Sequence, residues 1–143
     1  MIVADIPRRN ARRYADKTAV VFEDTRYSFK ELNERVNRLI NALTGIGLVR
    51  GDKMAVLTDN CHQIVEIFWA AAKGGFVMCP LNPGLSQREL SYLIDNAEAK
   101  VVFFTVNYEE LVDSLRSELH GIKDYVPIDP LSGEIAGYEE LLS

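Results

Sequence analysis

Short apolar segments alternate with segments of helical periodicity along most of this 143-residue chain, and this alternation limits its possible folds more than any other feature. Four runs are continuously apolar, which is typical of buried strands: residues 54–58, 76–81, 101–105 and 125–128. Parallel strands show this pattern because the helices that connect them cover both faces of the sheet. The sequence therefore predicts an α/β fold: a doubly wound parallel sheet with flanking helices, built from three successive right-handed βαβ units.

The N-terminal part of the chain predicts a different arrangement. A short helix is expected from about residue 6 to residue 15, with Pro7 tolerated because it lies in the first turn. Two β-rich runs, 19–23 and 27–29, are joined through Asp24 and Thr25. This pattern predicts an antiparallel β-hairpin ahead of the parallel sheet.

Two helix starts carry a capping box, in which a serine hydroxyl accepts the backbone N–H three residues on and a glutamate reaches back. The pairs are Ser28 with Glu31 and Ser86 with Glu89. The helix after Ser28 carries its apolar residues on one face and its polar residues on the other, which predicts that one side packs on the sheet. We expect both serines to be N-caps.

Two further helix starts are expected at asparagines. Asn60 is expected to cap a helix that reaches Lys73, and because this helix is apolar nearly all round, we expect it and its Trp69 to be buried. Asn107 is expected to cap the next helix but one. Gly121 would end that helix, with His120 in its last turn.

The composition fits one globular domain of ordinary type. The chain is 48% hydrophobic and 26% charged, and its net charge of −5 argues against a nucleic-acid partner. Cys61 and Cys79 lack metal spacing and are interpreted as small buried apolar residues in a reducing compartment. No apolar run is long enough to span a bilayer, and the N-terminus does not resemble a signal peptide, so we expect a cytoplasmic protein without an integral membrane segment.

A search for catalytic or ligand-binding motifs identifies no site. Residues 45–51 contain three glycines, but they follow a helix and precede a strand, the reverse of the order in a phosphate-binding loop. We interpret them, and the Arg50-Gly51-Asp52 tripeptide within them, as a helix stop and a turn. His62 and His120 do not have the spacing of metal ligands.

Four arginines make a basic stripe on the first helix: Arg8, Arg9, Arg12 and Arg13. Such a stripe has two interpretations: a surface for an anionic partner (a membrane surface or the phosphates of a cofactor), or an ordinary solvated helix face. The second is the simpler one.

Five stretches, in order, resemble the adenylate-forming (AMP-binding) superfamily, in particular its acyl-CoA synthetases: residues 27–32 (YSFKEL), 50–57 (RGDKMAVL), 71–83 (AAKGGFVMCPLNP), 89–94 and 99–102. The first resembles the motif Leu-Thr/Ser-Tyr-x-Glu-Leu, and the third resembles Leu-Lys-Ala-Gly-x-x-x-x-Pro-Leu-Asp/Asn-Pro with Gly74 in place of alanine. In the third, Gly74 is expected to end a helix, and Gly75 to let the next strand start close against it. The resemblance covers residues 3–142.

The resemblance implies an AMP-forming acyl-CoA ligase, which joins a carboxylic acid to ATP and transfers the acyl group to CoA. ATP, Mg²⁺ and CoA are then implied for the full-length parent enzyme, with a small-molecule carboxylate as substrate. Asn82 favours a fatty-acyl or aryl acid. The family's phosphate loop, its Tyr-Gly-x-Thr-Glu segment, its hinge aspartate and its C-terminal lysine do not occur in these 143 residues.

We therefore expect the chain to be the N-terminal subdomain of such an enzyme, truncated before the phosphate loop, with no catalytic, cofactor-binding or metal-binding residue in 1–143. The fragment alone would be inactive, and its partner would be the remainder of the parent enzyme. The alternative is a stand-alone, non-catalytic domain of the same fold that binds a partner. Self-association is also expected, through the hairpin (19–29) and the helix at 138–142, whose Leu141 and Leu142 would lack packing partners.

Overall fold

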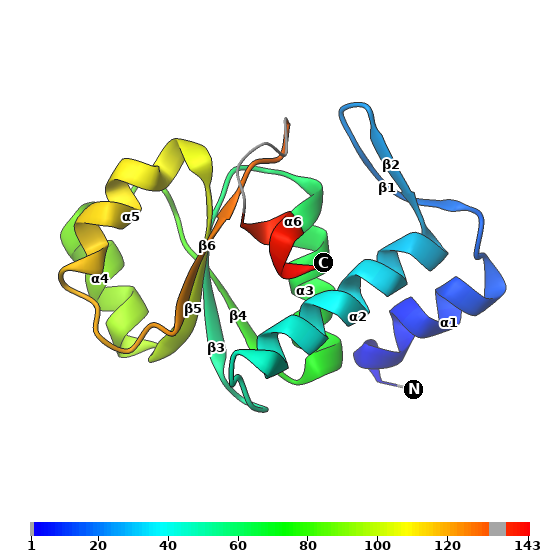
Figure 1. Ribbon diagram of the computed structural model, residues 1–143, viewed down its shortest axis with the longest axis horizontal. Helices are drawn as coiled ribbons and strands as arrows, with labels where there is room; N and C mark the ends of the chain where they lie inside the picture. Colours follow the sequence, from blue (N-terminus) through cyan, green and yellow to red (C-terminus); the bar gives the residue numbers. More distant parts are fainter. Residues whose placement is uncertain (1, 132–136) are drawn as a thin grey trace.

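The computed structural model describes residues 2–131 and 137–143 (Figure 1). The helices and strands follow one another in this order: a 3₁₀ turn Val3–Asp5, α1 Ile6–Arg13, β1 Thr18–Phe22, β2 Thr25–Ser28, α2 Phe29–Gly45, β3 Lys53–Leu57, α3 His62–Gly74, β4 Val77–Pro80, α4 Gln87–Asn96, β5 Ala99–Thr105, a 3₁₀ turn Val106–Tyr108, α5 Glu109–Arg116, β6 Asp124–Ile128 and α6 Tyr138–Leu141. The sequence also predicts a loop over residues 131–134, of which residues 132–134 lie outside the described residues.

The predicted doubly wound sheet is confirmed. Its four strands are parallel and run in the order β4-β3-β5-β6, so the three βαβ units place β4 on one side of β3 and β5 on the other. Figure 1 shows α4 and α5 on one face of the sheet and α2, α3 and α6 on the other. The hairpin and α1 lie at the far end of the α2 layer.

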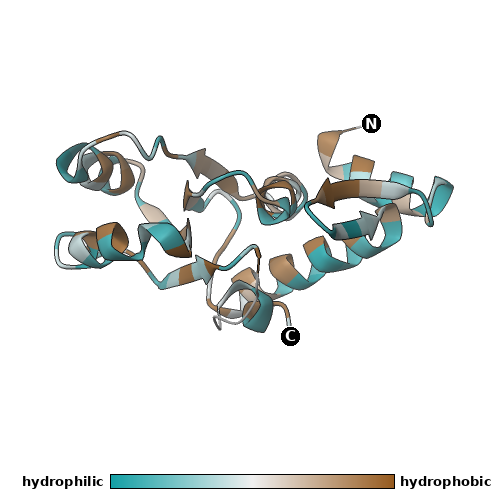
Figure 2. Ribbon diagram, turned by 90° about the horizontal axis from the view of Figure 1, so that it is seen from above, coloured by the Kyte–Doolittle hydropathy of each residue, from teal (hydrophilic) through white to brown (hydrophobic). Residues whose placement is uncertain are grey.

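Alternate residues of the central strands enter two different cores, which is why these strands are apolar throughout. On β5, Val101 and Phe103 pack under α2 and α3, whereas Val102 and Phe104 pack under α4 and α5. Figure 2 shows the contrasting pattern on the long helix α2, where hydrophobic and hydrophilic residues take different sides. Both faces of the sheet are therefore apolar and are covered by helices.

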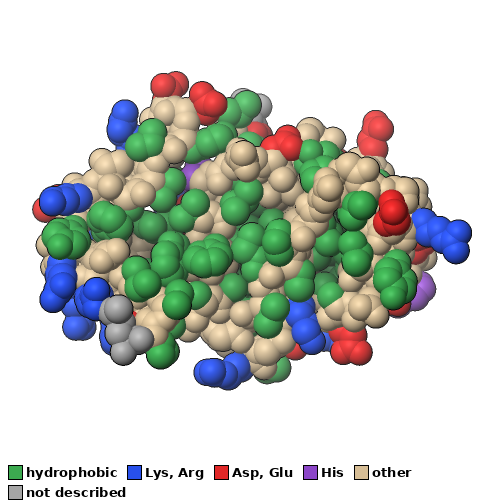
Figure 3. All heavy atoms as spheres, turned by 180° about the vertical axis from the view of Figure 1, so that it is seen from behind, with side chains coloured by type: hydrophobic (Ala, Val, Ile, Leu, Met, Phe, Trp, Pro, Cys, Tyr) green, Lys and Arg blue, Asp and Glu red, His purple; other side chains and the backbone are tan. Residues whose placement is uncertain are grey.

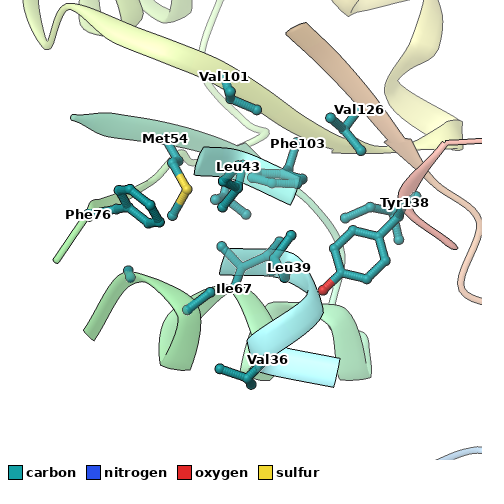
Figure 4. Packing of buried hydrophobic residues seen from close by; sticks show 14 of the residues in the cluster. Val36, Leu39, Leu43, Met54, Ile67, Phe76, Val101, Phe103, Val126 and Tyr138 are labelled. Atoms are coloured by element: carbon teal, nitrogen blue, oxygen red, sulfur yellow. The ribbon is translucent and has the colours of Figure 1, made fainter. Parts of the chain in front are cut away.

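The larger core lies between the sheet and the α2/α3 layer (Figure 4). Val36, Leu39 and Leu43 lie on α2 and are fully buried in this core. The spacing of these residues follows the helical period, as the sequence predicts. Lys73 of α3 adds a polar link, since its Nζ donates to the side-chain oxygens of Asn33 (2.9 Å) and Asn37 on α2.

The hairpin and both capping boxes are confirmed. β1 and β2 pair antiparallel, joined by a tight turn. The Ser28 hydroxyl accepts the N–H of Glu31, whose carboxylate accepts the N–H of Ser28, and Ser86 and Glu89 repeat the arrangement. Each box satisfies backbone groups that a helix start leaves without intrahelical partners.

The two asparagine caps were predicted wrongly. The N-cap of α3 is Cys61, whose side chain makes no capping hydrogen bond, and α5 begins only at Glu109 after a 3₁₀ turn. The Asn107 side chain donates instead to the carboxylate of Asp59, 2.8 Å away. A hydrogen bond to a distant loop thus replaces the local one that the sequence suggests.

The expectation that α3 is buried nearly all round is also wrong. Its first two turns bury three polar side chains, His62, Gln63 and Glu66, while Phe68 is 49% exposed and Trp69 is half-buried. Glu66 is inside because it forms hydrogen bonds with other elements, which are described below, and His62 lies against it on the same helix. The buried side-chain oxygen of Gln63 has no hydrogen-bond partner among the described residues. Hydropathy alone cannot anticipate this reversal.

The C-terminal helix is packed, contrary to the expectation that it would lack partners. Tyr138 is 1% exposed and Leu142 is 5% exposed, and both belong to the larger core, with Leu141 partly buried beside them. The hairpin does expose Val21, to 53%. Of the two segments proposed for self-association, the structure therefore leaves apolar surface mainly on the hairpin.

At the end of α3, the close approach that was expected at Gly75 is found at Gly74. The close approach is at Gly74, where an added Cβ would lie 2.6 Å from the ring of Phe76. Gly75 instead has the left-handed conformation, with φ of +79°, and its N–H caps α3 by donating to the carbonyl of Ala71. Glycine is required here for backbone conformation, because other residues rarely adopt positive φ.

We predict that Gly75→Ala lowers the free energy of unfolding by about 1–2 kcal/mol, the cost of the left-handed conformation for a residue with a Cβ. The control is Gly45→Ala at the end of α2, where an added Cβ would meet nothing within 4 Å. The control is expected to leave stability unchanged or to raise it. Urea denaturation of both variants measures the difference. Equal stabilities would show that the left-handed residue does not constrain this turn.

Candidate functional site

A buried carboxylate on α3 gathers charged and polar side chains from three helices. Glu66 is 1% exposed at its side chain, and both of its oxygens are engaged twice. Oε1 accepts from Arg35 Nε (2.9 Å) and lies 2.8 Å from His62 Nδ1, while Oε2 accepts from Arg35 Nη2 (3.1 Å) and from the Tyr138 hydroxyl (2.7 Å). We call Arg35, His62, Glu66, Tyr138 and Glu139 the Glu66 cluster.

Arg35 on α2 joins this carboxylate to a second one on α6. Its guanidinium makes two bonds to Glu66 and two to Glu139, at 3.0 and 2.8 Å. The same guanidinium lies 4.7 Å from the ring centre of Tyr27 on β2, and that ring meets His62 edge-on at 5.1 Å. Four elements, β2, α2, α3 and α6, therefore meet at one ion-paired centre.

Burial and hydrogen bonding act in opposite directions on the charged groups of this cluster. Burial tends to raise the pKa of Glu66, but the hydrogen bonds from His62, Arg35 and Tyr138 outweigh it and hold the pKa below its ordinary value. Burial tends to lower the pKa of Arg35, but its hydrogen bonds to Glu139 and Glu66 raise it above the ordinary value. Burial, reinforced by the charge of Glu66, raises the pKa of Tyr138 well above its usual range.

These shifts favour a structural role for the Glu66 cluster. A general base needs a pKa near the working pH and an accessible lone pair. Glu66 is ionised with a lowered pKa, and its four close contacts occupy both oxygens. The arrangement is suited to holding α6 and the hairpin against the α2/α3 layer.

A second polar cluster lies at the carboxyl ends of β3 and β5. The carboxylate of Asp59 accepts hydrogen bonds from Asn107 Nδ2 (2.8 Å) and the Tyr108 hydroxyl (2.5 Å), and the Thr105 hydroxyl accepts the backbone N–H of Asp59 at 3.2 Å. We call these four residues the Asp59 cluster. It bridges the two loops that follow the central strands.

The position of the Asp59 cluster is the one where ligands bind in open α/β sheets. The connection after β3 leads to β4 on one side of that strand, and the connection after β4 leads to β5 on the other side. The order in which strands are added to the sheet therefore reverses between β3 and β5. Ligands of such folds occupy the crevice outside the carboxyl ends at this reversal. Asp59 and Asn107 are exposed there and can offer hydrogen bonds. This edge is therefore the candidate contact surface for a small molecule.

The candidate residues of the sequence lie far apart in the structure. His62 joins the Glu66 cluster, whereas His120 is exposed and lies beyond the end of α5, so its expected place in the last turn of a helix is wrong. Cys61 is buried and Cys79 half-buried, and burial raises the pKa of both free thiols. Residues 45–51 form the expected helix stop and turn, with Gly47 and Gly51 at positive φ.

Sequence reasoning singled out neither Glu66 nor Arg35 nor Asp59. A usable signal was present for Glu66, a charged residue four positions after His62 in a helix that is otherwise largely apolar. No such signal existed for its partners, because Arg35 lies 31 positions and Tyr138 72 positions from Glu66 in the sequence. Among residues 2–131 and 137–143, no three His, Cys, Asp or Glu side chains are placed to hold a metal ion.

None of the described helices combines the length and hydrophobicity needed to cross a bilayer. The longest, α2, is amphipathic and buries only its inner face.

We predict that Glu66→Gln destabilises the chain by roughly 3 kcal/mol, at the lower end for removing one partner of a buried ion pair, because Glu139 still compensates Arg35. The control is Glu139→Gln, which changes the same charge on a side chain that is 43% exposed and should cost less than about 1 kcal/mol. Chemical denaturation at neutral pH compares them. Equal losses would contradict the central role of Glu66.

The acid sensitivity of stability should also depend on Glu66. Because its folded pKa lies below the ordinary value of 4.5, its contribution to stability is complete above that value and is lost as the pH falls through the folded pKa. Unfolding free energies measured from neutral pH downward should therefore fall less steeply below 4.5 in Glu66→Gln than in the parent chain. Parallel curves would show that Glu66 does not titrate differently on folding.

Comparison with known proteins adds family information to this geometry. A family model described as AMP-binding enzyme matches residues 7–137. The long-chain-fatty-acid–CoA ligase of Thermus thermophilus is 34% identical over 118 residues, which are 82% of this chain and 22% of that protein. The 3-methylmercaptopropionyl-CoA ligase of Ruegeria lacuscaerulensis is 32% identical over 126 residues, 85% of this chain and 23% of that protein.

The fold agrees with these sequence matches. The structure of an anthranilate CoA ligase in complex with anthranoyl-AMP matches with a TM-score of 0.89 at 25% identity, over 99% of this chain and 27% of that one. This chain spans less than a quarter of the length of the two curated relatives. With a family model that matches almost its whole length and a fold shared with a CoA ligase, the chain belongs to the AMP-binding enzyme family.

Proposed function

We propose that this chain is the N-terminal α/β scaffold of an AMP-forming acyl-CoA ligase. The overall reaction would join a carboxylic acid to ATP, releasing pyrophosphate, and then transfer the acyl group from the acyl-adenylate to the thiol of CoA. The observation that carries the proposal is the family match over residues 7–137. The anthranilate CoA ligase supports the adenylate step, because its structure contains anthranoyl-AMP.

The choice of acid rests on the named relatives. A fatty acid is supported by the Thermus thermophilus relative, while the Ruegeria relative is named for a different, sulfur-containing acyl group. Asn82 does not help to choose: its side-chain oxygen accepts the N–H of Gly84 at 2.9 Å and closes a turn after β4, which an aspartate would do equally well. We propose a fatty acid on the strength of the relative alone.

We also propose that the described residues do not themselves supply a site for ATP and Mg²⁺. Within residues 2–131 and 137–143, no group of acidic, His and Cys side chains could hold a metal ion, and the only buried carboxylate with several partners, Glu66, is committed to Arg35 and Tyr138. We therefore propose that the ligands of ATP, Mg²⁺ and CoA come from other residues of a longer parent enzyme. A cytoplasmic location, compatible with the two free thiols, is part of the same proposal.

A second candidate function is a stand-alone, non-catalytic domain that binds a partner. One observation favours it: α6 returns to the larger core and buries Tyr138 and Leu142, so the described residues cover their own core to a large extent. The two candidates differ in whether this chain can replace the corresponding part of an active ligase.

We predict that the 143-residue chain shows no ATP–pyrophosphate exchange with any carboxylate, and that it restores exchange when it replaces the matching segment of the Thermus thermophilus ligase. The segments share 34% identity, so the chimera should bury a similar core. Exchange of radiolabelled pyrophosphate into ATP measures both. The matched control is the same ligase with the segment deleted, which should be inactive.

Two outcomes would contradict the proposal. Exchange catalysed by the isolated, purified chain would show that its own residues bind ATP productively. A chimera that folds, as judged by cooperative thermal unfolding, but lacks exchange would favour the stand-alone domain.

A further inference from the structure

The first helix presents all four of its arginines to solvent on one side. Arg8, Arg9, Arg12 and Arg13 are exposed, and positions three and four apart on a helix are neighbours. The opposite side of α1 is turned inward, with Pro7 buried, and packs against α2. The stripe is therefore a fixed surface on a well-packed helix.

A groove lined mainly by arginines lies on this surface. Arg8, Arg9 and Arg12 line a shallow groove of about 320 Å³ together with Asp5, which pairs with Arg8 at 3.1 Å. Residues 1–17 contain five Lys or Arg and two Asp, a net charge of +3. Because the whole chain has a net charge of −5, residues 18–143 carry −8. The positive charge is thus concentrated at one end of an acidic chain.

Apolar side chains border the same surface. Ile2 is 68% exposed, Val3 56% and Tyr14 45%, at the two ends of the helix that carries the arginines. Figure 3 shows Lys and Arg side chains gathered at this end of the molecule, with hydrophobic side chains among them. Solvation of a helix face explains the arginines but gives no reason for exposed aliphatic residues beside them.

We propose that this surface, formed by Ile2, Val3 and the arginines of α1, docks on an anionic phospholipid membrane. Clustered arginines are attracted to the negative surface potential of such a membrane, and exposed aliphatic and aromatic residues enter the interfacial region. A nucleic acid would use the charge but leave Ile2 and Val3 in water. The inference goes beyond the proposed ligase function and does not depend on it.

The docking would be peripheral and sensitive to salt. The arginine heads face lipid phosphates while the helix lies along the membrane, and the acidic remainder of the chain is repelled and orients the protein with α1 toward the lipid. A free phosphate could occupy the groove, but it would not engage the aliphatic residues. Contact with the aliphatic residues therefore distinguishes a lipid headgroup from a free phosphate.

The test is co-sedimentation of the 143-residue chain with phosphatidylcholine vesicles that contain or lack phosphatidylglycerol. Binding is expected only to the anionic vesicles and should weaken as salt is raised. Arg12→Gln with Arg13→Gln should weaken it by roughly fivefold per arginine at low salt. The matched control is Arg50→Gln with Arg88→Gln, two exposed arginines outside this surface, which should leave binding unchanged.

A second pair of variants distinguishes lipid from other polyanions. Ile2→Ser with Val3→Ser should weaken vesicle binding without changing binding of inorganic pyrophosphate or of a single-stranded oligonucleotide, measured by calorimetry. The proposal is overturned if the chain does not bind anionic vesicles, if the two arginine pairs have equal effects, or if the serine variant binds vesicles as well as the parent chain. Circular dichroism confirms that each variant is folded.

Discussion

The parallel sheet depends on two central strands that must be covered on both faces. Met54 and Val56 of β3 enter one core, and Ala55 and Leu57 enter the other, and β5 behaves in the same way. Strands of this kind cannot stand at a surface, because either face would expose a row of apolar side chains. The two helical layers, the three crossovers and the position of the loops at the carboxyl edge follow from this requirement.

The Glu66 cluster holds two short elements, the hairpin and α6, on the larger core. The hairpin and α6 are short, and isolated elements of this length are marginally stable on their own. A buried carboxylate that needs four contacts, and an arginine that bridges two carboxylates, tie these segments to the larger core. Leaving Glu66 unpaired in this interior would be costly, which favours the arrangement that keeps its partners in place.

The contacts of the two polar clusters hold elements of the fold together, which supports the proposed role of a scaffold. Both oxygens of Glu66 are occupied, and Asp59 is bridged to Asn107 and Tyr108. Lys73, in the family-like stretch 71–83, links α3 to α2. Two surfaces offer exposed polar side chains for binding: the carboxyl edge of the sheet at Asp59 and Asn107, and the arginine face of α1.

The sequence by itself determined the α/β class, the βαβ units, the hairpin and both serine capping boxes, because these features depend on periodicity and on contacts three or four residues apart. Only the tertiary structure decided the strand order, the inward turn of His62 and Glu66, and the burial of Leu142. Asn107 shows the reason: its local capping bond and its bond to Asp59, 48 positions away, are chemically alike, and a sequence cannot rank them. Arg35 and Glu139 are separated by 104 positions, so their pairing exists only once the sheet has brought α2 and α6 together.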